Sequence, residues 1–114
     1  MAIVNINVYN DADFNRTFLW ETVDGAPIDM TGCSLEMMLR RHADDVDAVM
    51  RLATDTGEIV LTNPLNGTFT VRIAQIDLER LGLGNFDHSN IFTLNGNKIR
   101  VWSGTFTNNA GATR

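Results

Sequence analysis

The stretch DHSNIFTLNGNKIRVWSGTFT, residues 87–107, decides the fold that the sequence predicts. Asn95 and Gly96 divide it into two segments in which apolar and polar residues alternate. An Asn-Gly pair favours a type I′ turn, because both central residues of that turn need a positive φ. The stretch therefore predicts a β-hairpin formed by residues 87–94 and 98–107.

The same alternation, interrupted by turn residues, continues toward the N-terminus. Turn residues that recur about every 8–12 residues between short strands are typical of a β-sandwich. We therefore expect an all-β, immunoglobulin-like antiparallel β-sandwich of about 7–8 strands. The domain is predicted to cover residues 1–107, followed by a flexible tail at 108–114. The strands expected before the hairpin cover residues 2–9, 14–23, 33–41, 48–54, 58–62 and 67–73.

One segment breaks the strand pattern. Leu78 and Leu81 are three residues apart, which favours a short helical turn over residues 74–81, with Asp77 placed to cap it. Gly82 is expected to end this turn. The core is predicted to contain one inward face of each main strand, namely Phe14, Phe18, Trp20, Leu35, Leu39, Phe69, Val71, Ile99 and Val101.

Composition excludes several classes of protein. The 114 residues carry a net charge of −5, and such an acidic surface disfavours binding to nucleic acid. Residues 1–7 lack the positive region and the apolar stretch of a signal peptide, so we expect synthesis in the cytoplasm without a secretion leader. No apolar window is long enough to predict a membrane span.

Catalytic chemistry is not expected. His42 and His88 lie in different halves of the chain, and no nucleophile elbow accompanies either of them. Cys33 is the one cysteine, so it forms no intrachain disulfide, and we expect it to be a small buried side chain. We therefore predict that the protein is not an enzyme and that it uses no cofactor.

Metal binding is a weaker alternative that the sequence leaves open. Asp44, Asp45 and Asp47 lie close together in a polar loop, where carboxylates could hold calcium. The glycine and the distal glutamate of an EF-hand are missing, so a solvated loop is the favoured interpretation. No metal ligand is assigned.

Three apolar residues stand on faces that the alternation predicts to be outer ones. They are Leu19, Met38 and Trp102. If Ile99 and Val101 point inward, Trp102 points outward, where an exposed tryptophan is a good interface anchor. These residues are our candidate interface. The alternative is that one sheet is bulged and that the three are simply part of the core.

Several motifs together resemble a known type of protein. The chain is similar to the small β-sandwich virion proteins encoded among the structural genes of tailed bacteriophages and prophages. The motifs that carry this resemblance are DFNRTFLW (13–20), DGAPIDMTG (24–32) leading into LEMMLR (35–40), NGTFTV (66–71), GNF (84–86) and WSGTF (102–106).

The resemblance implies a structural protein of the phage tail or baseplate. It further implies a location in the virion, other virion proteins as partners, and assembly as a homo-oligomer. Two alternatives stay open on the residues alone: a head decoration protein, and a module that binds carbohydrate or another ligand at the loop end of the sandwich.

Overall fold

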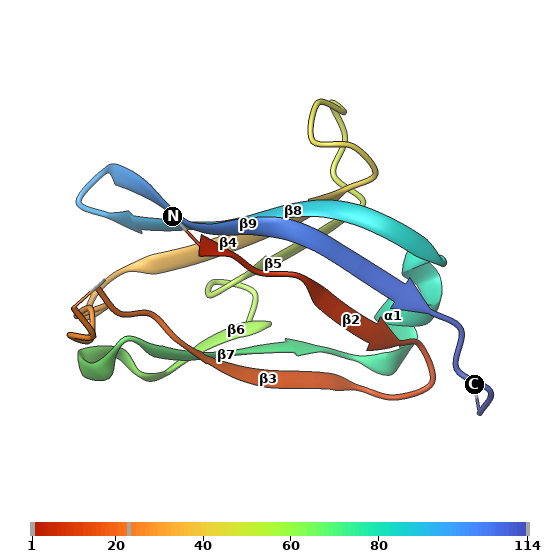
Figure 1. Cartoon of the computed structure of the whole chain (residues 1–114), viewed down its shortest axis with the longest axis horizontal. Helices are drawn as coiled ribbons and strands as arrows, with labels where there is room; N and C mark the ends of the chain where they lie inside the picture. The colour runs from red at the N-terminus through yellow and green to blue at the C-terminus, as the bar shows by residue number, and fades with distance from the viewer. Residues whose placement is uncertain (1, 23, 114) are drawn as a thin grey trace.

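The computed structural model describes residues 2–22 and 24–113, which form two sheets packed face to face (Figure 1). The larger sheet has the order β1-β9-β8-β4-β5, with β2 also paired to β9, and the smaller sheet has the order β3-β7-β6. The larger sheet consists of β1 (Ala2–Ile3), β2 (Ile6–Tyr9), β4 (Ser34–Arg40), β5 (Met50–Ala53), β8 (Gly84–Leu94) and β9 (Asn97–Asn109). The smaller sheet consists of β3 (Phe14–Leu19), β6 (Ile59–Asn63) and β7 (Thr68–Ile73).

This strand order is the immunoglobulin arrangement. Strands β4, β8 and β9 occupy the places of strands C, F and G, with β5 as C′, and β3, β7 and β6 occupy those of B, E and D. Two short helices, η1 (Pro64–Asn66) and α1 (Gln75–Leu81), flank β7. The predicted immunoglobulin-like sandwich is confirmed, as is a helical turn before the last hairpin.

The last hairpin forms at the predicted turn, but its strands are longer than the predicted 87–94 and 98–107. Strands β8 and β9 pair along their whole length from Gly84↔Asn108 to Leu94↔Asn97. At the turn, Asn95 has φ +52° and Gly96 has φ +82°, which is the pair of positive values that a type I′ turn requires.

The N-terminal segment corrects the purely antiparallel prediction. Residues 2–9 form two strands rather than one, and both pair in parallel with β9. The break at Val4 and Asn5 is explained by local bonding, because the Asn5 side chain accepts the Thr105 N–H at 3.0 Å and takes the place of a ladder carbonyl. The two faces of this segment still alternate, with Ile6 and Val8 buried.

A β-bulge corrects the prediction for Trp102. The register of β8 against β9 shifts between Asn90↔Trp102 and Ile91↔Arg100, so β9 carries one extra residue. Val101 and Trp102 are consequently both buried, and Trp102 is only 4% exposed. Ile99 was predicted to be core but is 50% exposed, because residues 95–100 lie at the turn end of the hairpin, outside the core.

The remaining predicted core residues lie between the sheets. Leu35, Leu39, Phe69 and Val71 are fully buried. On β3 and after it, burial is partial, since Phe14, Phe18 and Trp20 are half-buried side chains packed against the core. Position in the sheet explains this difference, because β3 is an edge strand.

Two further predictions need correction, namely the residue that caps α1 and the end of the domain. Asp77 does not cap α1; instead the Asp13 side chain, from the turn between β2 and β3, accepts the Gln75 N–H at 2.7 Å. The domain does not end at residue 107, because β9 continues to Asn109, and the buried Asn108 amide donates to the carbonyl groups of Leu78 and Gly82. Residues beyond the predicted boundary therefore help to hold α1 in place.

The motif DGAPIDMTG forms a turn that anchors one buried side chain. Asp29 Oδ1 accepts hydrogen bonds from the Thr31 N–H and the Thr31 hydroxyl at 2.9 and 2.6 Å, and these bonds lower the pKa of the Asp29 carboxyl. Gly32 follows with φ +77°. Met30, which lies between Asp29 and Thr31, is completely buried, so the motif closes one end of the sandwich.

Candidate assembly surface

The three candidate interface residues do not form one patch. Leu19 is 55% exposed at the end of β3, on the outer face of the smaller sheet. Met38 is half-buried on the outer face of the larger sheet. Trp102 lies between the sheets, with its ring centroid 4.6 Å from that of Phe18 and 5.5 Å from that of Phe69. Trp102 is therefore a core residue in a bulged sheet, as the alternative interpretation expected, and its role as an exposed anchor is wrong.

The open edge of the smaller sheet is built by β3. The Trp20 N–H donates to the Gly67 carbonyl on the β7 side at 2.8 Å. Because hydrogen-bonded and non-hydrogen-bonded pairs alternate in an antiparallel ladder, the N–H and C=O groups of Asn15, Thr17 and Leu19 point away from β7. Within residues 2–22 and 24–113, no second strand pairs with β3. We call Asn15, Thr17 and Leu19 the β3 edge.

The same three residues also form part of an outer face. Their side chains are exposed, and the Thr17 hydroxyl lies 2.9 Å from that of Thr70 on β7. The pairing of β3 with β7 runs over six residues without a register shift. At the far edge, β6 pairs with β7 through a register shift, which is one of the features that protect an edge strand from pairing. The β3 edge has no such irregularity.

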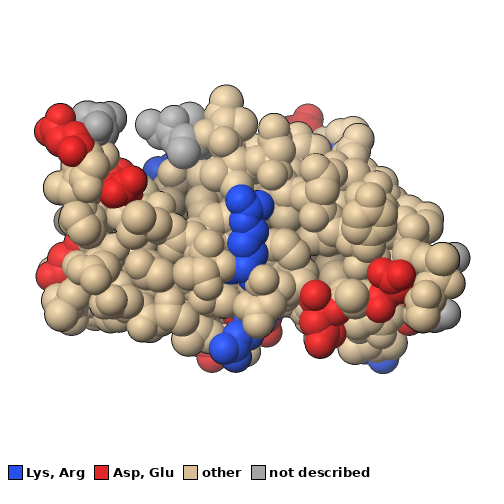
Figure 2. All heavy atoms as spheres, turned by 60° about the horizontal axis from the view of Figure 1, so that its bottom comes forward, with Lys and Arg blue, Asp and Glu red and all other residues tan. Residues whose placement is uncertain are grey.

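Charge distinguishes this face from the rest of the molecule. The chain has 14 acidic and 9 basic residues, yet within β3, β6 and β7, which are described completely, the charged residues are Arg16 and Arg72. Figure 2 shows basic side chains in the middle of this side of the molecule and acidic ones toward its two ends. Depletion of charge, and especially of acidic groups, is typical of the centre of a protein interface.

The outer face of the larger sheet is different. It contains a hollow of about 260 Å³ lined by residues of β4, β8 and β9, including Met38, Arg40, Asp87 and Arg100. None of the described residues lining the hollow is Phe, Tyr or Trp. Charged groups of both signs therefore cover this face, and Met38 lies among them rather than in an apolar patch.

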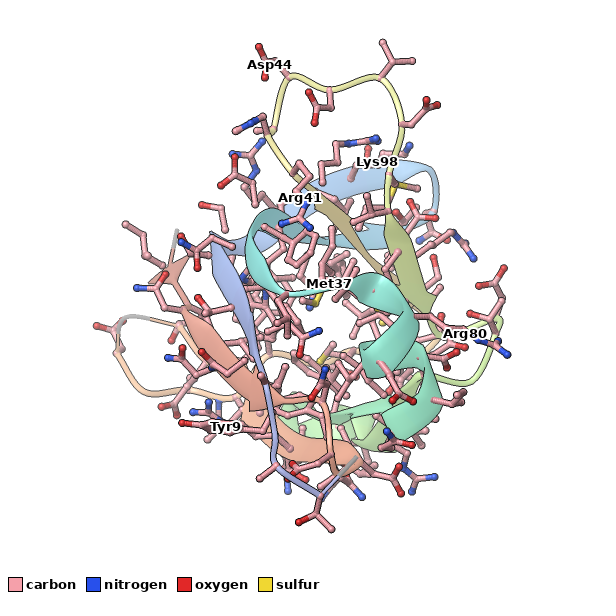
Figure 3. All side chains as sticks on the ribbon, turned by 90° about the vertical axis from the view of Figure 1, so that its right-hand side faces the viewer. Tyr9, Met37, Arg41, Asp44, Arg80 and Lys98 are labelled. Atoms are coloured by element: carbon pink, nitrogen blue, oxygen red, sulfur yellow. The ribbon has the colours of Figure 1, made fainter. Side chains whose placement is uncertain are left out.

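The acidic loop between β4 and β5 projects from the body of the molecule (Figure 1). Asp44 lies near its tip in Figure 3, and Val46 is 92% exposed. The Asp45 carboxylate accepts the His42 N–H at 3.1 Å. Among the described residues, no group of three or more His, Cys, Asp or Glu side chains is arranged to hold a metal ion.

The one buried histidine has both ring nitrogens engaged. His88 Nε2 lies 2.8 Å from the Val4 carbonyl oxygen, and the Trp102 Nε1–H donates to His88 Nδ1 at 3.2 Å. A carbonyl only accepts and an indole N–H only donates, so the ring is neutral with its proton on Nε2. Burial lowers the pKa of His88, in agreement with that assignment. The sequence offered no signal for this pairing, because Val4 and His88 are far apart in the chain.

The lone cysteine is not poised as a nucleophile. Cys33 is partly buried next to the core, and burial raises the pKa of its thiol. A reactive cysteine needs the opposite shift, since the thiolate is the nucleophile.

No helix in the described part of the chain is long and apolar enough to span a membrane.

Comparison with known proteins gives structural neighbours but no sequence relatives. The sequence matches no protein-family model and no curated protein. Among solved structures, the N-terminal domain of ORF48 of phage TP901-1 is 20% identical, with a TM-score of 0.43 over 96% of this chain and 84% of that one. Murine CRIg is 9% identical, with a TM-score of 0.46 over 94% of this chain and 92% of that one. Both TM-scores are low, and the fold assignment above depends on the strand order.

Proposed function

We propose that this chain is a non-enzymatic structural protein of a bacteriophage particle, and that it assembles with copies of itself and with other virion proteins through the β3 edge. The observation that carries the proposal is the combination, on Asn15, Thr17 and Leu19, of unpaired backbone groups and exposed side chains in a sheet whose three strands contain no acidic residue. Unpaired strand edges pair readily with another extended chain.

The phage setting depends on the resemblance of the sequence motifs to small virion β-sandwiches of tailed phages. Residues of one of these motifs stabilise the fold, since Asp29 and Thr31 close a turn over the buried Met30. In that setting the protein belongs to the virion, in the tail or baseplate. Labelling it in intact particles and locating the label tests this placement, and a label on the capsid surface would support head decoration instead.

A matched pair of variants tests the assembly surface. Leu19 and Ile99 are exposed to similar degrees, 55% and 50%, but only Leu19 belongs to the β3 edge. We expect the wild-type protein to form oligomers, measured by light scattering at rising concentration. Leu19→Asp should weaken association at least tenfold, which is about 1.4 kcal/mol, because it places a negative charge in the contact.

Ile99→Asp is the control, and it should associate like the wild type. Both variants should keep their stability within about 0.5 kcal/mol, since surface substitutions rarely change it more. A wild-type protein that remains monomeric at high concentration would contradict the proposed self-assembly. So would a loss of association that is equal in the two variants.

A further inference from the structure

The imidazole of His88 connects two parts of the fold across a strand. His88 in β8 is paired with Gly104 in β9, and Val4 lies on the other side of that glycine. A Cβ atom on Gly104 would lie 2.1 Å from the Val4 carbonyl oxygen, so only glycine leaves room for the carbonyl to approach the ring. The Val4 N–H is held separately by the Ser103 carbonyl at 2.9 Å.

This contact closes the gap in the N-terminal ladder. Between β1 and β2 the regular parallel pairing is interrupted, and the Val4 carbonyl bonds to His88 rather than to β9. A buried carbonyl without a donor is costly, so His88 is what allows the interrupted segment to stay against the sandwich. The ring itself is held in place by the Trp102 Nε1–H.

Protonation is incompatible with this arrangement. An imidazolium ring donates from both nitrogens, so a proton on Nδ1 would face the Trp102 Nε1–H, donor against donor. Trp102 is itself held in the core, where it is 4% exposed and packs against Phe18 and Phe69. The charged ring keeps its proton on Nε2, so the Val4 carbonyl loses its donor only where this repulsion displaces the ring.

We infer that His88 is a proton-sensitive latch that holds the N-terminal segment against β9 at neutral pH and releases residues 2–5 on acidification. Release would uncover the edge of β9 near Ser103 and Thr105, giving the sandwich a second strand edge. The inference does not depend on the proposed function, and it is testable in a monomer.

The charged groups around the ring favour the protonated form only weakly. Burial lowers the pKa of His88 and outweighs the hydrogen bonds with the backbone of Val4 and Thr105 and the charge of Asp87, its chain neighbour, all of which raise it. On the packed elements, Arg40 of β4 stands opposite Asp87 in the strand register, and the guanidinium carbon of Arg16 on β3 lies 4.9 Å from the Phe18 ring centroid.

The direction of the pH effect follows from the lowered pKa. The unfolded chain binds the proton near the ordinary value of 6.5, whereas the folded chain resists it. The stabilisation is complete above that value and is lost progressively as the pH falls below it.

Amide hydrogen exchange resolved by residue tests the latch. Between about pH 7.5 and about pH 5, after correction for intrinsic rates, protection of the Val4 amide should fall at least tenfold. The Asn10 amide, which donates to the Asn109 carbonyl at 3.0 Å at the far end of the same segment, should keep its protection. The His88 ring should show the Nε2–H tautomer at the higher pH.

Two glutamine variants show which histidine causes the pH effect, since the chain has two histidines, His42 and His88. His88→Gln retains a donor and an acceptor but does not titrate, so the pH effect at Val4 should disappear. His42→Gln, in the exposed loop, should leave the effect unchanged. Should His88→Gln fail to fold, the ring titration of the wild type and of His42→Gln decides the question.

Three results would overturn the inference. One is protection of Val4 that does not change with pH. Another is an equal loss at Val4 and Asn10, which would mean global unfolding rather than local release. The third is an Nδ1–H tautomer of His88 at neutral pH, because the Val4 carbonyl would then have no donor.

Discussion

Two strand edges lie on the same side of the sandwich, where residues 2–9 and β3 follow each other in the chain (Figures 1 and 3). At β9 the edge is covered by the N-terminal segment, which buries Ile6 and Val8. At β3 the outward-pointing backbone groups have no partner strand within the described residues. Leu19 on β3 and Tyr9 at the end of β2 are both exposed. The N-terminal segment therefore covers the edge of the larger sheet and leaves that of the smaller sheet open.

The difference between the edges has a local cause. Coverage of β9 depends on Gly104 for space, on Asn5 for the Thr105 N–H, and on His88 for the Val4 carbonyl. Open β3 has an exposed basic residue, Arg16, whose guanidinium lies over the Phe18 ring, and a charged side chain on an edge strand is one way to limit indiscriminate edge pairing. The closed edge is therefore part of the folded sandwich, and the open edge is the one that we propose for assembly.

Trp102→Ala should have the largest effect on the closed side. The substitution leaves a cavity between Phe18 and Phe69 and removes the donor to His88, so we expect a loss of about 3–5 kcal/mol of stability. Urea unfolding followed by circular dichroism measures it. A variant as stable as the wild type but defective in assembly would contradict the burial of Trp102 and restore it as an interface residue.

Gly104→Ala should have the next largest effect, and it should be confined to the closed edge. The added Cβ would meet the Val4 carbonyl, so the N-terminal segment must shift, at a cost of about 1–3 kcal/mol. Ser103→Ala, one residue earlier, is the control and should change stability little. Equal unfolding midpoints for Gly104→Ala and the wild type would show that the segment does not pass so close to β9.

Much of the fold was predictable because its signals are local. The Asn95-Gly96 turn and the buried alternation of Leu35, Met37 and Leu39 each depend on a few consecutive residues. For Trp102 the sequence left two orientations open, a regular strand and a bulged one, since one extra residue in β9 reverses the alternation without any change in composition.

The site was harder to predict than the fold, because its parts are distant in sequence. Alternation in residues 2–9 is the same for parallel and antiparallel pairing, so it could not show which edge this segment covers. Asp13 caps α1, and Val4 meets His88, only because the chain returns to the same place. Of the three candidate interface residues, Leu19 belongs to the β3 edge.

The most direct test of the account is amide exchange along β3 in dilute and in assembled protein. In dilute solution the amides of Arg16 and Phe18, which face β7, should be protected, whereas those of Asn15, Thr17 and Leu19 should exchange freely. In the assembled protein these three amides should gain at least a tenfold protection, about 1.4 kcal/mol, as they become paired. If they stay unprotected while oligomers form, the β3 edge is not the assembly surface.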